Sequence, residues 1–219
     1  MSRIRTLIEW SLICIPFVLI GIVAYVFLFS PGTSGSTSGL PDNGGFFQDP
    51  LPGPQVYSKA TGNWAFTLTS RYNYTLAGKV VGRHEFLKDL PDGIIALDLA
   101  VANGDLLKNG NLRFFTFTMG DHTLQYSYDV PNYTGLTEGY IDEHISNNHL
   151  VFLDPALESA VKGVETGDCL VITGKLVDIK GTSGQSTYLG TTSTVRNDEY
   201  PAGCEVILVE SFTPVPCGA

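Results

Sequence analysis

The chain has 219 residues, and 13 basic against 22 acidic side chains give it a net charge of −9. This length suits one folded domain with short accessory segments. An acidic surface repels nucleic acid and anionic lipid headgroups, so we expect no nucleic-acid partner.

The N-terminal region carries the clearest signal. Trp10–Phe29 is an apolar run without a charged residue. About 20 apolar residues at about 1.5 Å rise cross the roughly 30 Å core of a bilayer, which predicts a single transmembrane helix at residues 10–29. A cleaved signal peptide is the alternative, but its apolar region is usually about 7–15 residues long.

The charges beside this run predict its orientation. Arg3 and Arg5 precede it, and no basic residue follows before Lys59. The positive-inside rule therefore leaves residues 1–9 in the cytoplasm and the bulk of the chain outside, as a single-pass protein of the cell membrane.

Residues 30–55 are rich in Gly, Ser, Thr and Pro, which is typical of a flexible linker. Within them, Phe46 and Phe47 are candidates for docking on the domain, the membrane or a partner. We assign residues 56–219 to one extracytoplasmic domain.

Three cysteines lie in the predicted extracytoplasmic part, where disulfides can form: Cys169, Cys204 and Cys217. They allow one bridge, and sequence alone does not choose the pair. A Cys204–Cys217 bridge would hold the C-terminal tail, and a Cys169–Cys204 bridge would join two predicted strands. The triplets that begin at Asn73 and Asn132 match the glycosylation sequon.

Most of the domain has the pattern of β-strands. Gly78 and Gly82 indicate bends or bulges inside one long alternating stretch. Gly120-Asp121 is typical of a hairpin turn. The predicted strands are Trp64–Ser70, Tyr72–Phe86, Ile94–Val101, Leu112–Met119, Thr123–Asp129, Gly167–Val177, Gln185–Ser193 and Cys204–Phe212.

One helix is predicted between these strands. Asp154 is a suitable N-cap, and Pro155 suits the first helical position. Apolar residues then follow at near-helical spacing, and Gly167 is the expected end of the segment.

Aromatic residues are concentrated in one part of the domain. We expect them to fill a core with tyrosine hydroxyls at its rim, and the alternative is a binding platform for a protein or a glycan. They are Phe114, Phe115, Phe117, Tyr126, Tyr128, Tyr133 and Tyr140.

The order of glycine-containing strands, a short helix and a GDxVxIxGxL-type strand resembles small Greek-key barrels of the OB type. The segment GDCLVITGKLV, Gly167–Val177, carries this resemblance. We predict a mainly β fold, a small OB-like Greek-key barrel with one short α-helix, preceded by a single N-terminal transmembrane helix. OB folds host many activities, so the resemblance implies no reaction.

Three segments carry a second resemblance, which spans roughly Arg71–Phe212. They are His144–His149 (HISNNH), Thr192–Asp198 (TSTVRND) and Ala202–Glu205 (AGCE). They are similar to an uncharacterised family of single-pass prokaryotic membrane proteins without an assigned activity, which implies a shared fold and surface. The family pattern has a tryptophan before Gly104, where this chain has asparagine.

The densest polar cluster is the segment from His144 to His149. Two histidines five residues apart do not match the i, i+4 zinc motif of a helix. A third ligand would have to come from His122 or His84. We therefore expect no metal and no cofactor, with the intervening asparagines in a turn and the histidines bonded to loop backbone.

Two groupings are candidates for catalysis. Cys204 with His149 or His144 and Asn148 supplies the nucleophile, base and orienting amide of a thiol hydrolase, although burial or a disulfide would silence the thiol. A second grouping resembles the set that OB-type nucleases use, although a loop salt bridge is the simpler interpretation. It consists of Arg196, Asp198 and Glu205.

These observations predict a non-enzymatic, membrane-anchored extracytoplasmic module. We expect it to bind other membrane or cell-envelope proteins as an accessory subunit of an assembly. The alternatives are a cell-envelope hydrolase, built on one of the two groupings above, and a glycan-binding surface domain.

Overall fold

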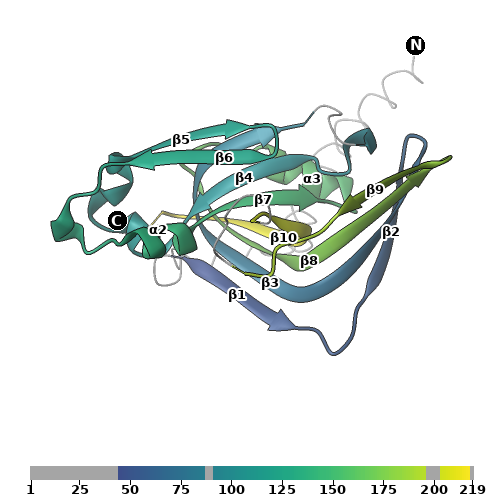
Figure 1. The fold of residues 1–219 in the computed structure, drawn as a ribbon, viewed down its shortest axis with the longest axis horizontal. Helices are drawn as coiled ribbons and strands as arrows, with labels where there is room; N and C mark the ends of the chain where they lie inside the picture. The colour runs from purple at the N-terminus through teal and green to yellow at the C-terminus, as the bar shows by residue number, and fades with distance from the viewer. Residues whose placement is uncertain (1–43, 87–90, 196–202, 218–219) are drawn as a thin grey trace, which may run out of the picture. The chain divides into compact units, whose positions relative to one another are not determined.

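The computed structural model describes residues 44–86, 91–195 and 203–217, which form a mainly β fold (Figure 1). The predicted transmembrane helix at residues 10–29 lies outside the described residues. Within the described residues, no helix has both the length and the apolar character that crossing a membrane requires.

Five strands close into a ring through backbone hydrogen bonds. β3 (Trp64–Glu85) pairs with β4 (Leu97–Ala102), and β4 pairs with β7 (Ile145–Val151). β7 pairs with β10 (Glu205–Val215), and β10 pairs with β8 (Cys169–Ser183), which returns to β3. The β7–β10 pair is parallel and the other four pairs are antiparallel.

β3 serves both ends of the ring because it is long and bent. It joins the two strands predicted from Trp64 to Phe86 into one. Its register with β8 shifts between Ser70 and Tyr72, and its register with β4 shifts between Val80 and Gly82. The irregularity predicted at Gly82 is therefore confirmed.

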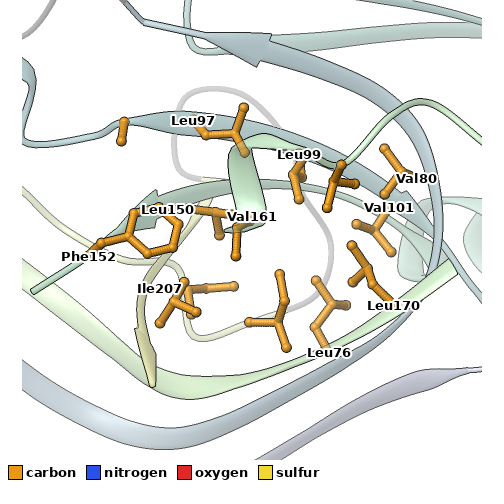
Figure 2. Packing of buried hydrophobic residues seen from close by; sticks show 14 of the residues in the cluster. Leu76, Val80, Leu97, Leu99, Val101, Leu150, Phe152, Val161, Leu170 and Ile207 are labelled. Atoms are coloured by element: carbon orange, nitrogen blue, oxygen red, sulfur yellow. The ribbon is translucent and has the colours of Figure 1, made fainter. Parts of the chain in front are cut away.

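Apolar side chains from all five strands fill the interior of the ring (Figure 2). α3 (Pro155–Lys162) adds Val161 to this core. Asp154 caps this helix by accepting a hydrogen bond from the backbone N–H of Ala156 at 2.8 Å, and Pro155 begins it, as predicted. The helix ends at Lys162 with Gly163 as its C-cap, earlier than the predicted end at Gly167.

Three further strands extend the ring. β1 (Gly45–Pro50) and β2 (Val56–Thr61) pair with β3, and β9 (Ser186–Gly190) pairs with β8. β1 lies within the segment predicted as a linker. It is ordered on β3 because Phe46 packs against the core, with its ring centroid 6.5 Å from that of Tyr74.

The segment of the chain between β4 and β7 forms a separate two-stranded sheet. β5 (Phe115–Gly120) and β6 (Thr123–Tyr128) form a hairpin that turns at Asp121 and His122, close to the predicted position. Its apolar face packs with Ala100 and Ile145 in a cluster on the outer side of β4 and β7 (Figure 1).

Short helices complete this insertion and its surroundings. They are η2 (Pro91–Gly93), η3 (Gly104–Phe114), η4 (Asn132–Thr134) and α2 (Glu138–His144). η3 consists of two short turns separated by non-helical backbone at Lys108, Asn109 and Gly110. Within the described residues, α2 is an α-helix that was not predicted from the sequence. The hydroxyl of Thr137 caps it by accepting a hydrogen bond from the backbone N–H of Tyr140.

The aromatic residues of the insertion mostly line the inner face of the hairpin. Phe115 is buried, and its ring stacks against that of Phe117 at 5.8 Å between centroids. Tyr126 is half-buried and donates a hydrogen bond to Asp142, whereas Tyr133 is exposed. The hairpin members thus contribute chiefly to packing.

One disulfide ties the C-terminal segment to the start of β8. It joins Cys169 to Cys217, a pairing different from the two weighed above, both of which used Cys204. The antiparallel register explains the choice, because Val215 lies opposite Cys169 and carries the following residues toward it. Cys204 lies outside this disulfide.

Candidate functional site

A row of polar side chains crosses the outer face of the ring. Asp98 on β4 lies directly opposite His149 on β7 and opposite His84 on β3. Side chains alternate along a strand, so these residues face away from the interior, into which Leu97 and Leu99 point. The row places a carboxylate between two histidines.

The hairpin brings a third histidine to this row. His122 occupies the β5–β6 turn with a left-handed φ of 55°, which is uncommon for a residue other than glycine. Its ring stacks on Phe86 with 4.0 Å between centroids and meets the ring of His149 edge-on at 5.4 Å. The turn is thereby held over Asp98 and His149.

Asp98 contacts both histidines. Its Oδ1 accepts a hydrogen bond from Nδ1 of His149 at 2.6 Å, and its Oδ2 lies 3.6 Å from Nδ1 of His122. Asp98 is fully buried, and His149 is 8% exposed. One potential ligand atom from each of the three residues lies within 4.8 Å of the others.

Hydrogen bonding in this cluster is incomplete. Both ring nitrogens of His122 and Oδ2 of Asp98 are buried without a hydrogen-bond partner. A buried polar group in this condition costs about 1–3 kcal/mol. An ion bound by Asp98 Oδ2 and by one ring nitrogen of His122 would give each of these two atoms a partner.

The distances suit a small metal ion. Zinc binds imidazole nitrogen and carboxylate oxygen at about 2.0–2.2 Å in a tetrahedron, which separates neighbouring ligand atoms by about 3.3 Å. The separations of 2.6 and 3.6 Å around Asp98 lie on either side of that value. Small movements of these side chains would lengthen the Asp98–His149 separation and shorten the Asp98–His122 separation toward that value.

The negative charge of Asp98 affects the pKa of Tyr188 on β9. Burial raises the pKa of the Tyr188 hydroxyl, and the negative charge of Asp98 raises it further. We predict that Asp98→Asn lowers the pKa of Tyr188 but leaves it above the ordinary value, because burial is the larger cause. Titration of the labelled tyrosine ring by NMR measures this, and an unchanged pKa would contradict the proximity of the two groups.

The polar cluster between His144 and His149 is divided by the structure. His149 belongs to the site. His144 instead stacks on Tyr140 with 3.8 Å between ring centroids, and its Nδ1 bonds the Tyr140 carbonyl. Asn148 lies next to His149 in the strand and so points to the opposite face, where its Nδ2 donates to the Leu99 carbonyl. The division arises because α2 ends at His144 and β7 begins at the next residue. The prediction of a turn at the asparagines between His144 and His149 is therefore wrong, since they lie within β7.

The Cys204 thiol lies near the hairpin turn. Its Sγ is 3.8 Å from Nδ2 of Asn147 and 4.0 Å from the carbonyl oxygen of His122. Glu205 is buried, while the other two members of its predicted grouping, Arg196 and Asp198, lie outside the described residues.

Asp98 was missed at the sequence level, although a signal was present. It is a lone carboxylate in the buried run IIALDLAVA, from Ile94 to Ala102. Charged residues are almost never fully buried unless they are paired, so its strand position alone called for a partner.

Both sequons are accessible. Asn73 is exposed on β3, where its Oδ1 accepts a hydrogen bond from Nζ of Lys175 at 3.0 Å. Asn132 is exposed at the start of η4. Each side chain therefore remains a candidate acceptor.

Comparison with known proteins identified no relative: no family model, curated protein or solved structure matches this chain.

Proposed function

We propose that this chain is a membrane-anchored extracytoplasmic module that binds a divalent transition-metal ion through Asp98, His122 and His149. It serves as a non-enzymatic accessory subunit of a membrane or cell-envelope assembly. The observation that carries metal binding is the approach of the three ligand atoms to within 4.8 Å of one another, with Asp98 and His149 buried and His122 half-buried.

The nitrogen and oxygen ligand atoms support a first-row transition-metal ion rather than magnesium or calcium. Imidazole suits zinc, copper, iron and nickel, whereas a site for magnesium or calcium uses oxygen ligands. Two histidines and one carboxylate therefore favour zinc or a neighbouring first-row ion. The open position in such a set is available to water or to a ligand from a partner.

The fold supports the proposal of an OB-like Greek-key barrel. The ring order β3–β4–β7–β10–β8, with β7 and β10 parallel and α3 between β7 and β8, follows the connectivity of that fold. In this chain, the β5–β6 hairpin is an insertion between the second and third ring strands. The insertion contributes His122, so the complete set of three ligands depends on the insertion as well as on the ring.

The disulfide supports the extracytoplasmic address. Bridges such as Cys169–Cys217 form and persist in oxidising compartments and are rare in the cytosol. The apolar run Trp10–Phe29 and the arginines before it favour the same orientation. The disulfide and the charge pattern beside the apolar run are thus two independent reasons to propose an extracytoplasmic domain.

Zinc titration tests metal binding directly. Full-length protein in mild detergent is stripped with a chelator and titrated with Zn²⁺ by calorimetry. We expect one ion per chain, and we expect His149→Ala to weaken binding by at least about a hundredfold, since outer contacts of metal sites alone are worth tenfold or more. His144→Gln is the matched control, because it removes a histidine that stacks on Tyr140 instead.

A second measurement reports the coordination geometry. Bound Co²⁺ in a tetrahedral site absorbs visible light, so the spectrum reports geometry without relying on affinity. Failure of the wild-type chain to bind either ion would reject the metal proposal.

The accessory role has its own test. The tagged protein is extracted from its own membrane in mild detergent, sized, and analysed for co-purifying chains. A defined complex with stoichiometric partners supports a subunit. A lone monomer or homo-oligomer would count against it.

Metal-assisted hydrolysis is the second candidate. Catalytic zinc sites have three protein ligands and one open position, which is the number of ligands present here. Burial of Asp98 and His149 beneath the hairpin turn favours binding over turnover. Hydrolysis of an ester or phosphoester that depends on zinc and on His149 would favour the enzyme.

A further inference from the structure

The three potential ligands come from two separate sheets. Asp98 and His149 are neighbours in the ring, whereas His122 is at the tip of the hairpin. In the described residues, β5 and β6 form backbone ladders with each other and with no ring strand. Side chains alone therefore hold the hairpin to the ring.

Apolar packing of the inner face of the hairpin is its main attachment to the rest of the domain, and hydrogen bonds add to it. Near the tip, Nδ2 of Asn147 donates to the His122 carbonyl at 3.3 Å, and further along, Tyr126 donates to Asp142 at 2.6 Å. An isolated two-stranded hairpin is only marginally stable in water. Detachment of the hairpin would therefore expose its own backbone hydrogen bonds to exchange.

The tip carries two unfavourable features without an ion. His122 has a left-handed backbone, and its buried ring nitrogens lack partners. A metal ion bonded to His122 would give one of these nitrogens a partner and offset part of this cost, and the bond would be lost whenever the hairpin lifts. Occupancy and hairpin closure are thus coupled in both directions.

We propose that a metal ion bound by Asp98, His122 and His149 fastens the β5–β6 hairpin to the ring, so that metal supply controls whether this face of the domain is closed. This inference rests on the proposed metal binding. It adds a regulatory consequence, because an ion held by the ring alone could not act on the hairpin.

Linkage gives the size of the effect. Loss of the bond to His122 weakens metal binding by a certain factor. At a saturating ion concentration, the equilibrium constant for opening of the hairpin must fall by the same factor, because opening breaks the same bond. We expect that factor to be on the order of tenfold to a hundredfold. It is measurable in two independent ways.

Hydrogen exchange tests the fastening. Full-length protein in mild detergent is compared by mass spectrometry with and without saturating Zn²⁺, for peptides within residues 115–128. We expect Zn²⁺ to slow their exchange by the ratio of dissociation constants of His122→Ala and wild type. In His122→Ala, Zn²⁺ still bound by the ring should leave hairpin exchange unchanged.

Tyr126→Phe is the matched variant that weakens the attachment of the hairpin without touching a ligand. It should speed hairpin exchange in chelator, and Zn²⁺ should slow it again. Unchanged hairpin exchange in wild type despite calorimetric binding would overturn the fastening while leaving the metal site intact. Absence of zinc binding would overturn both the metal site and the fastening. If Zn²⁺ slowed hairpin exchange equally in wild type and His122→Ala, the fastening would also be rejected.

Discussion

Asp98→Ala is expected to lower the free energy of unfolding by about 3 kcal/mol in metal-free buffer and to abolish metal binding. Asp98 is fully buried and bonds His149 at 2.6 Å. Removal of one member of a buried pair leaves the other without compensation, and this is the main source of the loss.

An apolar replacement of both residues separates stability from function. In Asp98→Val/His149→Leu no polar group is left unpaired by the change, so the free energy of unfolding should lie within about 1 kcal/mol of wild type or above it. The double variant should nevertheless bind no zinc. A chain that stays stable without the pair would indicate that the pair serves binding.

Urea unfolding of the full-length proteins in mild detergent measures both effects, with circular dichroism as the signal and a chelator present throughout. A small loss in Asp98→Ala would contradict the described burial. A large loss in the double variant would show that the pair is required by the fold, which would weaken the functional interpretation.

Removal of the disulfide is expected to cost about 4 kcal/mol in the chain-entropy description, because the bridge closes a long loop. The bridged cysteines are 48 residues apart in sequence. Cys169→Ala/Cys217→Ala should therefore unfold at much lower urea than wild type, and wild type treated with reductant should behave like the variant.

Cys204→Ser is the matched control for this comparison, because Cys204 lies outside the bridge. Its stability should not change when reductant is added beyond the change seen in wild type. Equal stability of the oxidised wild type and the double alanine variant would contradict a structural role for the bridge.

Local patterns predicted several elements well. Asp154 and Pro155 marked the start of α3, because a cap and a fixed φ act within one helical turn. Gly120-Asp121 marked the hairpin, and the segment Gly167–Val177 marked the first part of β8. These signals depend on neighbours in sequence, which is why they can be read without a structure.

Other features depend on contacts across the fold. β1 forms in a segment with linker composition because β3 supplies its hydrogen bonds and Tyr74 supplies a surface for Phe46. The cysteine pairing follows from the register of β10 on β8. Neither partner is close in sequence, so composition could not reveal either arrangement.

The candidate site shows the same division. Neighbouring residues alone show that His149 lies in a polar stretch, that Asp98 interrupts an apolar run and that His122 follows a turn signal. The meeting of these three residues, and the stacking of His144 on Tyr140 instead, depend on contacts between distant parts of the chain. Cross-strand pairing sets Asp98 against His149 over 51 positions of sequence, and packing of the hairpin brings His122 to them, because register and side-chain packing are properties of the closed ring.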